Sequence, residues 1–284
     1  MTERRTSAGL ARRDRPRLRG PVLLAQCAGD GIKPHVAAVL KRVAARLRPA
    51  SHVAVLLDLD GTLAPLRRRP GEVVVGPAVR RALERLVRAP RTRVYVISGR
   101  RLADVRSRVG VDGVGYLGLH GWEARLRQSL PAASRRLVRR ARSGLRRALE
   151  PFEGVWVEDK GAVLAVHYRE AREQDVVRAR SVIRRLMKNF APPLRLLASK
   201  KVWEVFPPEV RGKGEAAGLL ACAQPPGTLV LYAGDDASDE QAFRALPEAI
   251  TVRVGGRGRT AAKWRLAGPE EVCQLLERMA EILR

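Results

Sequence analysis

The sequence predicts an α/β fold with a doubly wound parallel-sheet core and an inserted α+β cap domain. Short, continuously apolar segments such as Val53–Leu57 and Thr228–Ala233 are typical of strands that are buried on both faces of a parallel sheet. Amphipathic segments with helical spacing alternate with them, which is the βαβ order of such folds. In residues 131–206, by contrast, strand-like segments follow one another directly, which favours an inserted antiparallel module.

The elements of the first half of the core follow from the spacing of apolar residues. Residues 1–50 are predicted as a basic N-terminal extension that ends in a lead-in helix over about 35–48. We assign residues 51–122 to the first part of the core. It is expected to contain two buried strands and, between them, a helix that has proline in its first turn: Val53–Leu57, Pro77–Val87 and Arg93–Ile97 in chain order.

The rest of the chain is predicted to complete the cap and then return to the core. We assign residues 123–206 to the inserted cap and residues 207–284 to the second part of the core. The cap should contain an α-β-β-α-β-β set with strands at Val155–Glu158, Ala162–Tyr168, Leu194–Ala198 and Val202–Phe206. The core should resume with a helix and another buried strand, Lys213–Cys222 and Thr228–Ala233.

The composition excludes some classes of protein. No apolar segment in the 284 residues is long enough for a membrane span, and residues 1–20 lack a secretory signal, so we expect a cytoplasmic protein without a membrane partner. The net charge of +26 suggests nucleic-acid binding, but only eight of the 55 basic residues are Lys, a skew that a GC-rich genome produces by itself. We therefore expect the partner to be a small anionic molecule rather than nucleic acid. We also expect a monomer.

The first motif with chemical content is Asp58-Leu59-Asp60-Gly61-Thr62, which directly follows a buried strand. Residues two apart in an extended chain point to the same side, so Asp58 and Asp60 can face one site at the carboxyl edge of the sheet. Two neighbouring carboxylates repel each other unless a cation or a proton lies between them. Mg²⁺ is the natural solution, because it prefers oxygen ligands and binds carboxylates together with phosphate.

A second acidic cluster, Gly234-Asp235-Asp236-Ala237-Ser238-Asp239, follows another buried strand. Asp235 is placed to complete the metal site, and Asp239, one helical turn later, could reach it through water. Either acidic cluster alone could equally be a helix N-cap. Ser98 and Lys213 supply a hydroxyl donor and a compact cation for phosphoryl oxygens, although each alone could be a helix cap or a solvated charge.

These residues resemble the four ordered motifs of the haloacid dehalogenase-like (HAD) phosphatases. Within that superfamily the chain is similar to the trehalose-6-phosphate phosphatase family, over about residues 51–284. Phe206 and Gly212 depart from the family pattern. The segments that carry the narrower resemblance are Val96–Arg100, Gly118–Glu123, Lys160–Gly161, His167–Arg169, Lys200–Glu204 and Gly234–Glu240.

The resemblance implies a mechanism and a set of site residues. Asp58 would be the nucleophile that forms an aspartyl-phosphate, and Asp60 the general acid and base. Ser98 and Lys213 would complete the catalytic set, and Asp58, Asp60, Asp235 and Asp239 would hold Mg²⁺. The cap and its hinges would bind the sugar of trehalose 6-phosphate, with candidates Gly99, Arg100, Glu123, Lys160, His167, Arg169, Lys200 and Glu204. Lys160 and His167 could instead be an ordinary hairpin residue and a satisfied strand histidine.

Two alternatives remain open at this point. The same chemistry could act on another sugar phosphate, such as sucrose phosphate or mannosyl-phosphoglycerate. A protein of a different class, an Arg-rich binding protein built on a non-catalytic version of the same scaffold, is disfavoured by the intact acidic motifs and Lys213.

Overall fold

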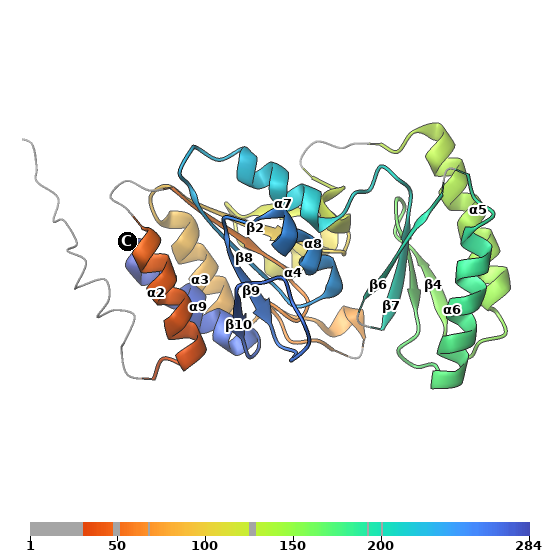
Figure 1. Ribbon diagram of the computed structural model, residues 1–284, viewed down its shortest axis with the longest axis horizontal. Helices are drawn as coiled ribbons and strands as arrows, with labels where there is room; N and C mark the ends of the chain where they lie inside the picture. The colour runs from red at the N-terminus through yellow and green to blue at the C-terminus, as the bar shows by residue number, and fades with distance from the viewer. Residues whose placement is uncertain (1–30, 48–51, 68, 125–128, 192, 200) are drawn as a thin grey trace, which may run out of the picture.

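The computed structural model describes residues 31–47, 52–67, 69–124, 129–191, 193–199 and 201–284. Its larger sheet has six strands in the order β10-β9-β8-β1-β2-β3, and all neighbours in it are parallel (Figure 1). The strands are β1 (Val53–Leu57), β2 (Thr92–Ile97), β3 (Gly115–Leu117), β8 (Leu229–Gly234), β9 (Ile250–Val254) and β10 (Trp264–Leu266). Strand β1 therefore lies at the centre, between β2 and β8.

Helices cover both faces of this sheet. Alternate residues of β1 explain why: Val53, Val55 and Leu57 belong to one hydrophobic cluster, and Ala54 and Leu56 to another on the opposite face. The first cluster includes residues of α2 (Pro34–Arg46), α3 (Pro77–Arg88), α4 (Leu102–Val109) and α9 (Pro269–Ile282). The second includes residues of α7 (Lys213–Cys222) and α8 (Ala237–Ala245). Because β1 is buried on both faces, its sequence is continuously apolar.

The second sheet is antiparallel and lies to the right of the core in Figure 1. Its order is β4-β5-β7-β6. The strands are β4 (Trp156–Asp159), β5 (Leu164–His167), β6 (Arg195–Ser199) and β7 (Val202–Phe206). Helices α5 (Ala132–Leu149) and α6 (Glu173–Met187) cover its outer face and form a separate hydrophobic cluster with it. The other face of this sheet is directed toward the core.

The predicted fold class is confirmed, with a parallel core and a separate antiparallel sheet of the cap type. The structure also contains elements that were not predicted, among them β3, β9, β10 and α9. The division of the chain at residues 122/123 and 206/207 stays a prediction. The N-terminal extension up to residue 30 lies outside the described residues, whereas the lead-in helix is present as α2.

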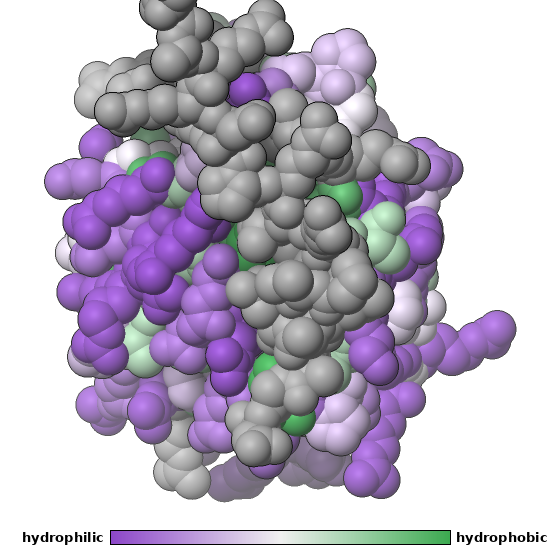
Figure 2. Space-filling model, turned by 90° about the vertical axis from the view of Figure 1, so that its left-hand side faces the viewer, coloured by the Kyte–Doolittle hydropathy of each residue, from purple (hydrophilic) through white to green (hydrophobic). Residues whose placement is uncertain are grey.

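Figure 2 shows the face at the α2 end of the molecule, where hydrophilic side chains dominate the coloured area. In the described part of the chain, no helix combines the length and the apolar character needed to cross a bilayer.

Candidate active site

The candidate site lies where β1, β2 and β8 end. Parallel pairing places Leu57 of β1 opposite Val96 of β2 and Ala233 of β8, so the residues that follow these strands meet at one edge of the sheet. Asp58 follows β1, Ser98 follows β2 and Asp235 follows β8. The chain order reverses at β1, and in open α/β sheets ligands bind at such a switch point, beyond the carboxyl ends of the strands.

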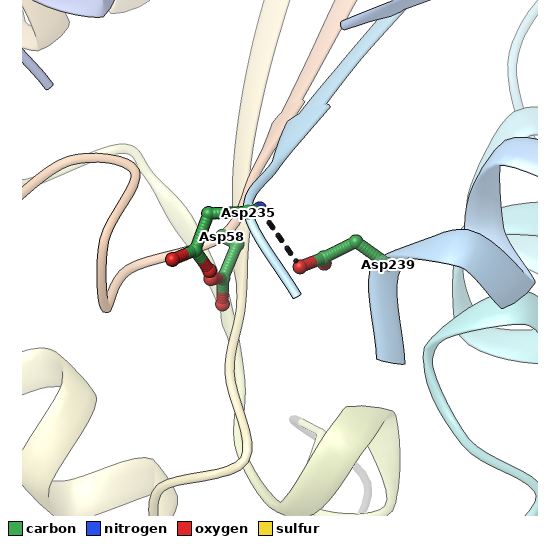
Figure 3. Close-up of side chains that lie close together, drawn as sticks. All are labelled: Asp58, Asp235 and Asp239. Atoms are coloured by element: carbon green, nitrogen blue, oxygen red, sulfur yellow. Dashed lines mark hydrogen bonds between the residues drawn. The ribbon is translucent and has the colours of Figure 1, made fainter. Parts of the chain in front are cut away.

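Three buried carboxylates gather at this edge. Asp58, Asp235 and Asp239 each offer an oxygen atom, and these atoms lie within 4.8 Å of one another. Figure 3 shows the carboxyl groups of Asp58 and Asp235 side by side, while Asp239 approaches from helix α8. Gly61 makes room for this arrangement, because a Cβ atom there would lie 1.8 Å from Asp235 Oδ2. Its φ of +83° is also unfavourable for any residue with a Cβ.

Lys213 bridges two of these carboxylates from the first turn of α7. Its Nζ lies 2.5 Å from Asp58 Oδ1 and 2.8 Å from Asp239 Oδ1, and its side chain is buried. Burial alone would lower the pKa of the Lys213 ammonium, but the charges of Asp239 and Asp58 outweigh it and raise that pKa well above its usual value. Lys213 is therefore a fixed positive charge beside Asp58.

Asp239 is held by four hydrogen-bond donors. Oδ1 accepts from Lys213 Nζ and, at 2.7 Å, from the Tyr232 hydroxyl. Oδ2 accepts from the backbone N–H groups of Asp235 at 3.1 Å and Asp236 at 2.9 Å; Figure 3 draws the bond from Asp235. A direct bond from Asp239 to a metal ion would have to displace one of these donors. Its most evident structural effect is to fix Lys213 and the start of the loop after β8.

The electrostatics of the cluster fit a bound divalent cation. Burial raises the pKa of Asp58 well above its usual value, the Lys213 charge opposes this rise, and the charges of Asp239 and Asp235 add to it. One ammonium does not neutralise three buried carboxylates, and buried charges require compensation. Clustered carboxylate oxygens suit hard cations such as Mg²⁺. Both oxygens of Asp239 are engaged by the donors described above, so Asp239 is the least suited of the three to bind such an ion directly.

Asp60 is clamped by an arginine. Arg100 Nε and Nη2 each lie 2.7 Å from one oxygen of Asp60, which is the bidentate geometry of strong guanidinium–carboxylate pairs. Asp104 accepts a further bond of 2.7 Å from Arg100 Nη1. The backbone N–H of Arg100 donates to Ser98 Oγ at 3.2 Å. The carboxylates of Asp60 and Asp104 raise the pKa of Arg100 against the effect of burial, so the clamp is an ion pair.

A cavity of about 350 Å³ joins these groups to the cap sheet. Asp58, Asp60, Ser98, Lys213 and Asp235 line it from the core. The predicted sugar-binding residues that also line it are Gly99, Arg100, Lys160, His167, Arg169 and Glu204. Glu123 does not line this cavity: its Oε2 accepts a 2.6 Å hydrogen bond from the backbone N–H of Leu102 at the start of α4. Lys200 lies outside the described residues.

The sequence analysis missed His120 as a site residue. His120 Nε2 lies 2.7 Å from Glu204 Oε2, and Lys160 Nζ lies 3.3 Å from Glu204 Oε1 and 3.1 Å from the Gly99 carbonyl. His120 and Lys160 lower the pKa of the buried Glu204 carboxyl despite the opposing effect of burial. The backbone of His120 is left-handed, with φ +60°, which is uncommon for a residue other than glycine. Only the glycines on either side of Leu119-His120 hinted at this turn.

The fold and the site together define a class. The doubly wound parallel core with an antiparallel cap recurs in solved structures. A haloacid dehalogenase-like hydrolase from Bacteroides thetaiotaomicron shares this fold with a TM-score of 0.58 and 15% identity, over 81% of this chain and all of that one. The C-terminal domain of C. albicans trehalose-6-phosphate phosphatase has a TM-score of 0.73 and 23% identity, over 94% of this chain and 98% of that one. At these identities the likeness establishes the fold.

The family follows from the sequence. The family model described as trehalose-phosphatase matches residues 56–270, and the chain belongs to this family. A trehalose-phosphate phosphatase of Mycobacterium tuberculosis is 33% identical over 250 residues, which are 83% of this chain and 63% of that protein. An uncharacterized glycosyl hydrolase of the same species is 36% identical over 258 residues, 85% of this chain and 19% of that protein. The chain thus spans less than two thirds of the length of these curated relatives.

Proposed function

We propose that this chain is a Mg²⁺-dependent phosphatase that hydrolyses trehalose 6-phosphate through an aspartyl-phosphate on Asp58. The observation that carries the proposal is the meeting of Asp58 and Asp235, at adjacent strand ends, with Lys213 of α7 in a cavity that the cap sheet also lines. Membership of the trehalose-phosphatase family supports the choice of substrate.

The nucleophile is Asp58. Its carboxylate oxygen attacks phosphorus and forms an acyl-phosphate bond while the bond from phosphorus to the sugar oxygen breaks. Lys213, fixed by Asp239, offers an ammonium to the phosphoryl oxygens, and the Ser98 hydroxyl adds a donor. Asp58 and Asp235 would hold a Mg²⁺ ion, which would supply further positive charge for the transferring group. Catalysis of this kind depends mostly on positioning and electrostatics.

Asp60 is the proton carrier. It gives a proton to the departing sugar oxygen and afterwards takes one from the water that hydrolyses the aspartyl-phosphate, which restores the Asp58 carboxylate. In the structure Arg100 engages both oxygens of Asp60. In the first half Asp60 carries a proton, so Arg100 must loosen its hold when substrate enters. The substrate phosphate is a competing anion for the same guanidinium.

The test is phosphate release from trehalose 6-phosphate with Mg²⁺ and with a chelator. The wild type should release phosphate only with the metal, and Asp58→Asn should abolish release while keeping the far-UV circular dichroism of the wild type. Asp112→Asn, at an exposed position outside the cavity, is the matched control and should keep wild-type activity. Phosphate release by Asp58→Asn would refute the assignment of Asp58 as the nucleophile. A preference for sucrose phosphate or mannosyl-phosphoglycerate in a substrate panel would refute trehalose 6-phosphate as the substrate but not the phosphatase mechanism.

A further inference from the structure

An aromatic pair stands on the face of the cap sheet that is directed toward the core. The rings of Trp156 and His167 are stacked, with centroids 4.0 Å apart and planes 16° from parallel. The two residues lie directly opposite each other in the pairing of β4 with β5. Trp156 is 49% exposed, and only a few large apolar residues of the described chain are as open to solvent.

His167 has a hydrogen-bond partner on the same face of the sheet. His167 Nε2 lies 2.8 Å from Glu158 Oε2, and Glu158 is two residues from Trp156 on the same face of β4. The hydrogen bond from His167 lowers the pKa of the Glu158 carboxyl, so the acceptor is ionised at neutral pH. The Nε2 atom of His167 is thus engaged within the cap, and its ring supports one face of the indole.

The position of the pair points to a ligand. Single apolar side chains on a surface need no explanation, but Trp156 is stacked, fixed by a partner and part of the wall of the candidate catalytic cavity. Asp58 and Asp60 line the same cavity from the core, whereas Trp156 and His167 line it from the cap. The phosphate end and the aromatic end of the cavity therefore belong to different sheets.

We propose that Trp156, supported by His167, is the platform on which the sugar ring that does not carry the phosphate packs. A pyranose has an apolar face of C–H groups and a rim of hydroxyls, so an aromatic face combined with a few polar groups recognises it. Lys160 and Glu158 line the cavity near the platform and provide such polar groups. This inference rests on the proposed function, and it adds the subsite that makes the enzyme select a disaccharide phosphate over a monosaccharide phosphate.

The platform has a kinetic consequence that a structural role would not have. Trp156→Ala should raise KM for trehalose 6-phosphate about tenfold, as expected for the loss of one stacking contact, and change kcat less than about twofold, because the contact is equally present in ground and transition states. Glucose 6-phosphate lacks the second ring, so its KM and kcat should not change. Trp156→Phe should restore most of the affinity for the disaccharide.

A binding experiment tests the platform without catalysis. Unphosphorylated trehalose is titrated by calorimetry into wild type, Trp156→Ala, Trp156→Phe and the control Trp264→Phe, whose indole lies in β10 at the far edge of the core sheet. We expect the affinity for trehalose to fall about tenfold in Trp156→Ala. The control Trp264→Phe should bind trehalose like the wild type, and Trp156→Phe should bind it within about threefold of the wild type.

The outcomes separate the platform from the proposed function. Wild-type trehalose affinity in Trp156→Ala, or no trehalose binding by the wild type, overturns the platform and leaves the phosphatase proposal untouched. Equal loss of glucose 6-phosphate and trehalose 6-phosphate turnover in Trp156→Ala also overturns it, because it indicates general damage to the cap. Trehalose binding that depends on Trp156 in a protein without phosphatase activity supports the platform and refutes the proposed function.

Discussion

The most specific mutational prediction concerns Gly61. Its φ is +83°, and a Cβ built there would lie 1.8 Å from Asp235 Oδ2 and 2.5 Å from Asp235 Cγ. Real Cβ contacts do not fall below 3.0 Å, so in Gly61→Ala the two groups must separate from 1.8 Å to 3.0 Å, a displacement of about 1.2 Å. The backbone penalty of a left-handed alanine is about 1–2 kcal/mol.

These two effects have different consequences. A misplacement of about 1 Å in a catalytic group lowers the rate about 100-fold, so we expect Gly61→Ala to lose about two orders of magnitude in kcat for trehalose 6-phosphate. Because the backbone penalty is small, Tm should fall by only about 2–8 °C. Phosphate-release kinetics at saturating Mg²⁺ and thermal unfolding measured by circular dichroism give the two quantities separately.

Gly227 is the matched control. It also has a positive φ, +76°, but a Cβ there meets nothing within 4 Å. Gly227→Ala should therefore show the same modest loss of Tm with wild-type kcat. If Gly61→Ala retained more than half of the wild-type kcat, Asp235 would not need its observed position, and the reasoning from the strand ends would be wrong. Equal loss of activity in both variants would attribute the effect to backbone strain instead.

Two further predictions concern the buried charges. Lys213→Met leaves the carboxylates of Asp58 and Asp239 without their ammonium, so it should lower the free energy of unfolding by about 3–5 kcal/mol and abolish turnover; denaturation with urea at the wild-type midpoint would contradict this. Glu204→Gln should cost a similar amount at pH 7, because His120 and Lys160 lose an ionised partner. The pKa of Glu204 is lowered in the fold, so its stabilisation is present above the ordinary value of 4.5 and decreases progressively as pH falls from there toward the lowered pKa. The gap between wild type and Glu204→Gln in urea should therefore narrow at pH 3.5, and a constant gap would contradict the ion-pair explanation.

The sequence was sufficient to predict the bounds of helices and strands that have a clear apolar pattern within their own residues. Strands β1 and β7 have the bounds that apolar patterning predicts, as has α7. Burial on both faces gives β1 its uninterrupted apolar sequence. Strands β3 and β10 contain three residues each, which is too short for any periodicity to appear. They are strands because the preceding strand of the chain, β2 or β9, offers its backbone hydrogen bonds.

The site was predictable in its location but not in its contacts. The acidic motifs could be placed at one sheet edge, because parallel strands end at the same edge. The partner of Asp60, by contrast, is 40 residues away, and Glu204 is 84 residues from His120. Such pairs depend on how loops and the cap lie in space. Trp156 was predicted only as part of a strand, since its role as a wall of the cavity depends on which face of the cap sheet is directed toward the core.

The contacts of Lys160 connect the cap to the loop after β2. Its Nζ lies between Glu204 of β7 and the carbonyl of Gly99, the residue that separates Ser98 from Arg100. A second link between the sheets joins the Ser199 hydroxyl of β6 to Asp236, which caps α8 beside Asp235. The loops after β2 and β8 are therefore both held by residues of the cap sheet. A shift of this sheet relative to the core would move the groups around Asp58 from two sides, so the position of the cap and the geometry of the acidic cluster are coupled.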